Sequence, residues 1–143
     1  MYKIDTEGMV TALEFKKITM LKIFTGEDIM LGDVPLYKAI INEARALNLA
    51  GGTVFKGVGG YAASVRGINS GAVSFFSGIA DLPVLVEIAD NRKNIERLLP
   101  FLEKNADHAL VLVEEAEYLS TAYTRERERQ LALGENKKDC GTV

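Results

Sequence analysis

The chain has few of the residues that metal sites and disulfides need. Its 143 residues include one histidine, His108, one cysteine, Cys140, and no tryptophan. A single cysteine cannot form an internal disulfide, so the sequence gives no sign of an oxidising compartment. A lone histidine beside Asp107 lacks the ligand count of a metal site, and a surface or interface histidine is the simpler interpretation. The sequence therefore predicts no metal.

A long apolar run and an excess of positive charge are also missing. The apolar runs, such as residues 109–113, are far shorter than the ~20 residues of a membrane helix, and the N-terminus lacks a basic stretch followed by an apolar one. The formal net charge is −3, which provides no basic face for nucleic acid. We expect a cytoplasmic protein with no nucleic-acid binding and no membrane insertion.

Catalytic groups are equally scarce. The chain has no second histidine, no buried cysteine candidate and no pair of acids with a reason for opposite pKa shifts. Glu114, Glu115 and Glu117 cluster, but Glu115 and Glu117 share one strand face, where a solvated edge explains them. The sequence therefore predicts no catalytic residues, and we expect that the chain is not an enzyme.

What the chain does have is a regular alternation of strand and helix patterns. The expected strands cover residues 17–25, 53–58, 84–89 and 109–119. The first places Ile18 and Met20 on one face and Leu21 and Ile23 on the other. A strand that is apolar on both faces is typical of the centre of a sheet.

Two helices are predicted between these strands. Asp33 is expected to cap the first, which has Pro35 in its first turn and ends near Asn48, a residue that tolerates the left-handed conformation. Asp90 is expected to cap the second, inside which Pro100 predicts a kink or a break. The two buried stripes are Leu36, Ile40, Ala44 and Leu47, and Ile95, Leu98, Leu99 and Leu102.

This order of elements predicts an α+β fold of the ferredoxin-like βαββαβ type. Right-handed crossovers place the first and third strands in the middle of a four-stranded antiparallel sheet, with two helices on one face. The other face has no helix, so a second copy of the chain is the simplest cover for it. We expect an N-terminal extension at 1–16, the domain at 17–123, and a polar tail at 124–143 that is a short charged helix or disordered.

The longest expected connection, residues 59–82, joins the second and third strands. A compact domain rarely carries a structureless connection above about 12 to 15 residues unless it is functional or disordered. Eight of the 13 glycines lie between Gly51 and Gly78. The connection is otherwise rich in apolar side chains, which favours docking on a protein surface over a passive hairpin extension. The candidate partner-contacting residues are Tyr61, Arg66, Phe75 and Phe76.

A glycine-rich step begins this connection. Gly57-Val58-Gly59-Gly60 can cradle an anion through backbone N–H groups, and a strand end that bends into a loop explains it equally well. No Lys-Ser or Lys-Thr pair opening a helix follows, which excludes a P-loop.

Four segments, in this order and spacing, resemble the PII-like proteins of a largely uncharacterised family related to the nitrogen regulatory PII signal-transduction proteins. They are LKIFTGE, GDVPLYKAIINEARALNLAGGTVFKGVGGYA, DLPVLVEIAD and IERLLPFLE. The resemblance covers residues 18–119. It implies a ferredoxin-like homotrimer in which residues 59–82 correspond to the partner-binding T-loop of PII.

The resemblance also implies a ligand site. PII proteins bind adenine nucleotides between subunits, beside the start of the T-loop, and Lys56, Gly57 and Gly59 match their Lys-Gly-x-Gly step. The implied nucleotide-binding residues are Lys56, Gly57, Val58, Gly59 and Gly60, with AMP or ADP as candidate ligands. Gly60 stands where PII has an arginine, and LEKNADHAL replaces the phosphate-gripping loop TGxxGDGK. We therefore expect AMP to bind at least as well as ATP.

Three functions remain in comparison. The resemblance favours a regulatory trimer that senses a small metabolite and acts on a partner such as a transporter or an enzyme. A CutA-like trimer, which binds a small ligand or a cation without a switching loop, is the alternative. A dimeric ferredoxin-like oxygenase would instead use the uncovered sheet face as a substrate cavity. The long connection favours the first, and the mass of the assembly separates the third from the other two.

Overall fold

The computed structural model describes residues 2–4, 10–60 and 82–139 of the chain. Internal contacts divide the chain into two units. The first is Ile18–Ala116, and the second combines Met1–Lys17 with Glu117–Val143. The sequence-based boundaries at 16/17 and 123/124 stay a prediction.

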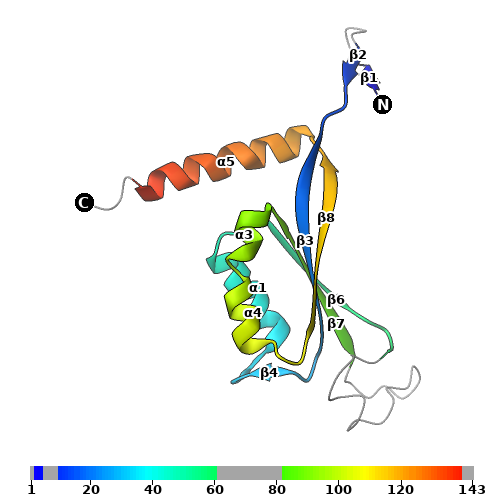
Figure 1. Ribbon diagram of the computed structural model, residues 1–143, viewed down its shortest axis with the longest axis vertical. Helices are drawn as coiled ribbons and strands as arrows, with labels where there is room; N and C mark the ends of the chain where they lie inside the picture. The colour runs from blue at the N-terminus through cyan, green and yellow to red at the C-terminus, as the bar shows by residue number, and fades with distance from the viewer. Residues whose placement is uncertain (1, 5–9, 61–81, 140–143) are drawn as a thin grey trace. The chain divides into compact units, whose positions relative to one another are not determined.

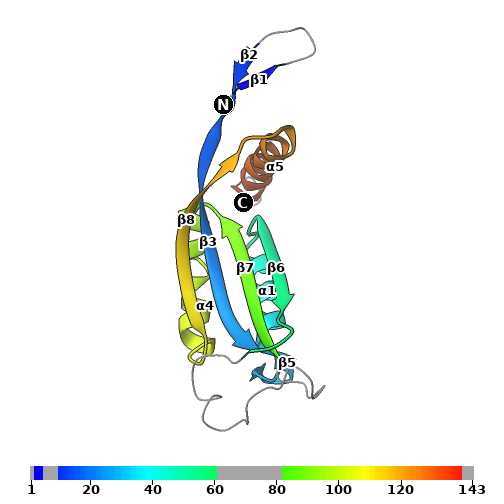
Figure 2. The same cartoon turned by 90° about the vertical axis from the view of Figure 1, so that its right-hand side faces the viewer.

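A four-stranded antiparallel sheet with the strand order β6-β7-β3-β8 forms the centre of the first unit (Figures 1 and 2). Its strands are β3 (Phe15–Gly26), β6 (Gly51–Lys56), β7 (Pro83–Asp90) and β8 (Leu110–Leu119). The expected first and third strands, β3 and β7, are therefore central, as predicted. Their register pairs Leu21 with Ile88 and Ile23 with Val86.

The helices α1 (Leu36–Ala46), α3 (Arg92–Glu96) and α4 (Leu99–Asn105) cover one face of this sheet (Figure 2). The α+β, ferredoxin-like fold class is thereby confirmed. Alternate residues of β3 and β7 point into the core and are fully shielded from water. Each large aliphatic side chain buried there contributes roughly 1.5 to 3 kcal/mol. The fully buried aliphatic residues are Leu21, Ile23, Leu36, Ile40, Val84, Val86, Ile88, Ile95 and Leu98.

The start of α1 differs from the prediction. Residues before the helix form a small hairpin in which β4 (Met30–Leu31) pairs with β5 (Val34–Pro35). Asp33 lies in the turn of this hairpin and does not cap the helix, whose N-cap residue is Pro35. No side chain caps α1, but a backbone group accepts from its first N–H: the Leu36 N–H donates to the Ile29 carbonyl at 2.8 Å. The predicted left-handed residue at the other end is confirmed, since Asn48 has a φ of 60°.

The predicted break at Pro100 is present, and two short helices replace the single expected one. Pro100 stands in the first turn of α4, where its missing N–H costs no hydrogen bond. Beside the break, Leu98 is fully buried, whereas Leu99 packs only partly against the core.

Asp90 has a different role from the predicted helix cap. The cap of α3 is Asn91, whose side chain accepts a hydrogen bond from the Asn94 N–H at 2.9 Å. Asp90 is buried at the end of β7, where one carboxylate oxygen accepts from the Ala50 N–H at 2.8 Å. The other oxygen accepts from the Asn94 side-chain amide at 3.0 Å and from the Asn91 N–H at 2.6 Å. Asp90 therefore ties the start of β6 to the start of α3.

The second unit contains the strands β1 (Tyr2–Ile4) and β2 (Val10–Ala12), which pair antiparallel, and the helix α5 (Ala122–Asp139). Of the two states left open for the polar tail, the structure has the helix. Its first turn is capped reciprocally, since the Thr124 N–H donates to Thr121 Oγ1 at 3.2 Å and the Thr121 N–H donates to Thr124 Oγ1 at 2.8 Å.

Candidate functional site

Lys56, the last residue of β6, lies on the helix-covered side of the sheet, since it pairs with the buried Val84. Its Nζ is 2.8 Å from Glu27 Oε1 and 5.7 Å from the centre of the Tyr37 ring. The hydrogen bond that Lys56 donates to Glu27 raises the pKa of Lys56, with a smaller contribution from Tyr37. The ammonium group is therefore charged at neutral pH and already has a carboxylate partner.

Gly57 and Gly60 occupy positions where a side chain does not fit. A Cβ on Gly57 would lie 2.7 Å from Pro83 Cγ, closer than real contacts allow. Gly60 has a φ of 126°, in the region that favours glycine. The Gly57 N–H donates to the Pro83 carbonyl at 2.8 Å, so this amide, contrary to expectation, is not free for an anion. Between them, Val58 is 83% exposed.

Glu27 contacts both ends of the 57–82 connection. Its side chain holds Lys56 at the entrance, and its N–H donates to the Leu82 carbonyl at the exit, at 3.1 Å. Sequence reasoning missed this residue, because an acid directly after a strand looks like an ordinary solvated turn. The predicted partner-contacting residues Tyr61, Arg66, Phe75 and Phe76 lie outside the described residues.

The sheet face opposite α1, α3 and α4 is called the open face below. Among the described residues of the 18–116 unit, no helix covers it (Figure 2). Its side chains alternate with the core residues along each strand. One row across it consists of Phe55, Leu85 and Phe24. Phe24 is 38% and Phe55 49% exposed, which is unusual for such large apolar groups. The open face contains Ile18, Met20, Lys22, Phe24, Thr53, Phe55, Leu85, Glu87, Ala89, Leu110, Leu112 and Glu114.

A charged row crosses the middle of the open face. Lys22 Nζ lies 3.0 Å from Glu114 Oε2 and 4.0 Å from Glu87 Oε1. The hydrogen bond that Lys22 donates to Glu114 raises the pKa of Lys22, and Glu87 adds a smaller effect. Apolar side chains therefore lie on both sides of a fixed row of alternating charges. Such a row favours one alignment of any surface that packs on the open face.

The sequence indicated that Glu115 is simply solvated. In the structure it belongs to a hydrogen-bonded network on the helix-covered side of the sheet. The hydroxyl of the buried Thr19 donates to both of its carboxylate oxygens, at 3.1 and 3.2 Å. Arg92 of α3 binds Glu115 at 3.3 Å and Glu96 at 3.0 Å. This network links β3, β8 and α3, so its role is structural.

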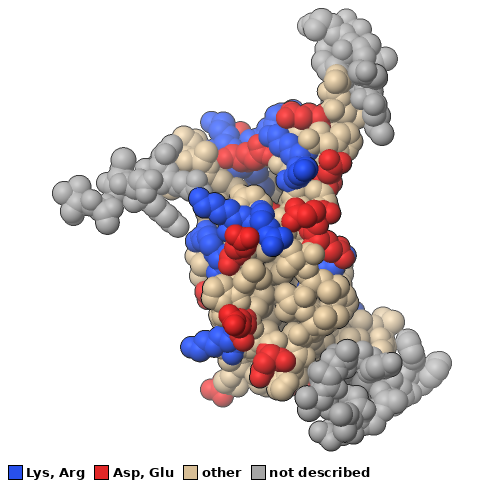
Figure 3. All heavy atoms as spheres, viewed as in Figure 1, with Lys and Arg blue, Asp and Glu red and all other residues tan. Residues whose placement is uncertain are grey.

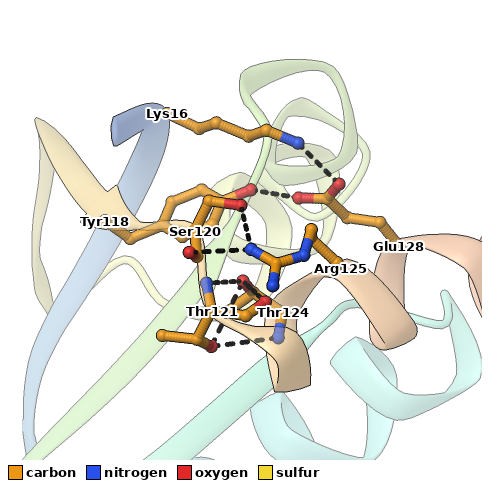
Figure 4. A network of polar contacts seen from close by, with 7 residues as sticks. All are labelled: Lys16, Tyr118, Ser120, Thr121, Thr124, Arg125 and Glu128. Carbon is orange, nitrogen blue, oxygen red and sulfur yellow. Dashed lines mark hydrogen bonds and ion pairs between the residues drawn. The ribbon is translucent and has the colours of Figure 1, made fainter. Parts of the chain in front are cut away.

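In the second unit, Glu128 of α5 is held from two sides (Figure 4). It accepts a hydrogen bond from the Tyr118 hydroxyl and forms an ion pair with Lys16 at 2.8 Å. These two contacts, that of Lys16 being the larger, lower the pKa of Glu128. Near the helix start, Arg125 donates to the Ser120 carbonyl at 3.0 Å. Polar contacts therefore attach α5 to Lys16, Tyr118 and Ser120 of the same unit.

His108 and Asp107, the pair singled out in the sequence, form a surface contact with Nε2 and Oδ2 4.0 Å apart. Among residues 2–4, 10–60 and 82–139, no group of three metal-ligating side chains occurs. No described helix is long and apolar enough to span a bilayer. On the side seen in Figure 3, Lys and Arg side chains lie next to Asp and Glu side chains.

Comparison with known families matches the first unit. The profile of DUF190, described as "Uncharacterized ACR, COG1993", matches residues 18–118. The chain belongs to the DUF190 family. A UPF0166 protein of Aquifex aeolicus is 33% identical over 103 residues, which cover 72% of this chain and 94% of the relative. A UPF0166 protein of Methanocaldococcus jannaschii is 33% identical over 98 residues, 68% of this chain and 87% of the relative. The predicted membership of an uncharacterised family is confirmed.

Solved structures resemble the DUF190 chain more distantly. A putative PII-like signaling protein from Thermus thermophilus has a TM-score of 0.49 and 14% identity, covering 78% of this chain and 97% of that chain. CPII from Thiomonas intermedia, in a structure bound to ADP and bicarbonate, has a TM-score of 0.49 and 12% identity, covering 76% and 93%. Likeness at this level says nothing about the ligand of the DUF190 chain.

Proposed function

We propose that this DUF190 protein is a PII-like regulatory homotrimer without enzymatic activity. It senses a small metabolite, with AMP and ADP as the candidate ligands, at clefts between its subunits. It then acts on a partner protein, such as a transporter or an enzyme, through residues 59–82. The proposal rests chiefly on one observation: Lys56 and the glycine step lie together at the end of β6, where the long connection leaves the sheet.

The open face supports the trimer. Burying apolar surface contributes about 25 cal/mol per Å², and the row of Phe55, Leu85 and Phe24 offers such surface on a rigid sheet. In a threefold-symmetric oligomer, the open faces of three copies meet around the axis and cover one another's apolar surface. The charged row at Lys22 then fixes the register of packing, because a shifted copy would place like charges together.

The residues around Lys56 support a ligand with a small anionic group. Lys56 supplies the cation, and Gly60 carries no side chain that would shield its backbone from a ligand. The segment 102–110 stands in place of the PII phosphate loop. Its one lysine, Lys104, is exposed, and the acidic Asp107 follows three residues later. One lysine and no glycine loop suit a monophosphate better than a triphosphate.

The test is a ligand panel on the full chain. Adenosine, AMP, ADP, and ATP with and without magnesium are compared by thermal shift, and the assembly mass is measured by light scattering. We expect AMP or ADP to raise the melting temperature of a trimer. Gly59→Val should abolish that shift without dissociating the trimer, because its side chain would project toward the ligand.

Gly51→Val is the matched control, since Gly51 lies at the start of β6, at the opposite end of the strand from Lys56, with open space around its Cβ position. It should bind AMP like the wild type. A monomer at micromolar concentration, or a strong magnesium-dependent preference for ATP, would contradict the proposal. Binding of a cation or small ligand that ignores Gly59→Val would favour the CutA-like alternative.

A further inference from the structure

Lys56 is not an empty anion site, because Glu27 already holds its ammonium group at 2.8 Å. The Lys56 side chain is 53% exposed, whereas that of Glu27 is 22% exposed. A ligand arriving from solvent therefore reaches Lys56 more easily than it reaches Glu27. Any anion that binds this lysine must share it with Glu27 or displace Glu27.

We propose that Glu27 is a built-in competitor for the ligand, and that it restricts the Lys56 site to phosphate-bearing ligands. This inference rests on the proposed function, because it assumes that Lys56 faces the ligand. It adds a residue, Glu27, that determines which class of anion can bind there.

The competition follows from the covalent attachment of Glu27. A carboxylate on the same chain competes at the effective concentration of an intramolecular group, of order mM. A free carboxylate with the same charge and geometry gains little over Glu27, so acetate and similar metabolites cannot displace it at low concentration. A phosphate monoester carries about −1.5 to −2 charges at neutral pH and has three acceptor oxygens. It therefore offers Lys56 a stronger partner than Glu27 does.

The surroundings allow Glu27 to release Lys56 without unfolding the site. The Glu27 N–H remains bound to the Leu82 carbonyl, and the Gly57 N–H remains bound to the Pro83 carbonyl. Neither bond involves the Glu27 side chain. The ring of Tyr37, 5.7 Å from the Lys56 ammonium, supports it from a second direction. The exchange is thus confined to one carboxylate and one ammonium group.

A double-mutant cycle tests the inference. ADP and adenosine binding are measured by calorimetry for the wild type, Glu27→Gln, Lys56→Met and the double variant. We expect Glu27→Gln to tighten ADP binding up to about fivefold, the effect of removing a partly exposed ion-pair partner. Adenosine binding should not change, because adenosine carries no phosphate. Lys56→Met should weaken ADP binding, and in its background Glu27→Gln should have no further effect.

The controls separate direct competition from general repulsion. Glu117→Gln removes an exposed carboxylate of β8 and should leave ADP affinity unchanged. If Glu27→Gln tightens ADP equally with and without Lys56, the carboxylate acts only through its long-range field and the inference is wrong. Equal ADP affinity of wild type and Glu27→Gln also overturns it, while the proposed function stands. If ADP binds neither the wild type nor Glu27→Gln, and AMP added as a further titrant binds neither, the proposed function and this inference are overturned together.

Discussion

Different interactions stabilise each of the two units of the chain. The 18–116 unit has a core of fully buried aliphatic side chains between its sheet and helices. The helix α5 of the second unit has no buried side chain between residues 122 and 134, and its contacts are ion pairs and hydrogen bonds. Buried apolar side chains carry no titratable group, whereas exposed ion pairs respond to pH and are screened by salt. The two units should therefore fail under different conditions.

The largest effect is expected from opening a cavity in the core. Ile40→Ala removes a fully buried side chain of α1 and should lower the free energy of unfolding by about 2 to 5 kcal/mol. Leu133→Ala, at a 52% exposed position of α5, is the matched control and should change it little. Chemical denaturation followed by circular dichroism measures both. Equal losses would show that α5 packs as tightly as the core.

A buried polar contact should rank second. Asp90→Ala leaves the Ala50 N–H and the Asn94 side chain without their acceptor. The expected loss is about 1 to 3 kcal/mol, the cost of unsatisfied buried donors. Asp90→Asn keeps one acceptor oxygen and should lose less, as measured by the same denaturation curves. A neutral Asp90→Ala would mean that water replaces the carboxylate.

A substitution on the open face should weaken association of the subunits more than it weakens folding. Phe24→Glu places a charge in the apolar row beside Leu85, which should dissociate the proposed trimer while leaving the secondary structure intact. Light scattering gives the mass, and circular dichroism gives the fold. Leu133→Glu, another exposed apolar position, serves as control and should remain trimeric. A trimeric Phe24→Glu would place the interface elsewhere.

The smallest effect is a loosening of α5 in acid. The contacts with Lys16 and Tyr118 lower the pKa of Glu128, so its stabilising contribution is present above its unfolded pKa of about 4.3. That contribution is lost as the pH falls through the lower folded pKa. Amide exchange of the α5 backbone should therefore accelerate in this acid range, and Glu128→Gln should show the faster exchange already at neutral pH.

Glu126→Gln is the control for this experiment. It removes an ion pair with Arg129 inside α5 but leaves the contact between Lys16 and Glu128 in place. The wild-type acid response should therefore persist in this variant. If Glu128→Gln exchanges like the wild type at neutral pH, the contact with Lys16 does not hold the helix.

Apolar periodicity was enough to predict the fold of the first unit. It identified β3 and β7 as the central strands, and Pro100 located the break between α3 and α4. Polar side chains were harder to place. Asp33 and Asp90 were both predicted to be helix caps. Asp33 instead lies in the turn of the β4–β5 hairpin, and Asn91 caps α3 in place of Asp90. A cap depends on the backbone angles of the preceding residues, which a sequence pattern does not specify.

The candidate site was predicted only as far as the main-chain step 56–60. The sequence indicated a lysine and glycines beside a long connection, and the structure adds their partners. The pair of Lys56 and Glu27 joins residues far apart in sequence, as does that of Thr19 and Glu115. Such pairs depend on strand register, which appears only once β3, β6, β7 and β8 are aligned.

The pairing of β3 with β7 also bears on how fast the protein folds. Met20 lies opposite Ala89, with α1, β6 and residues 57–82 between them in the chain. The central ladder therefore closes a long stretch of chain, which slows folding, whereas α1 forms from local contacts. Each doubling of such a loop costs only about 0.6 kcal/mol in closure entropy. Family members whose β6 to β7 connections differ in length should consequently fold at different speeds while keeping similar stabilities.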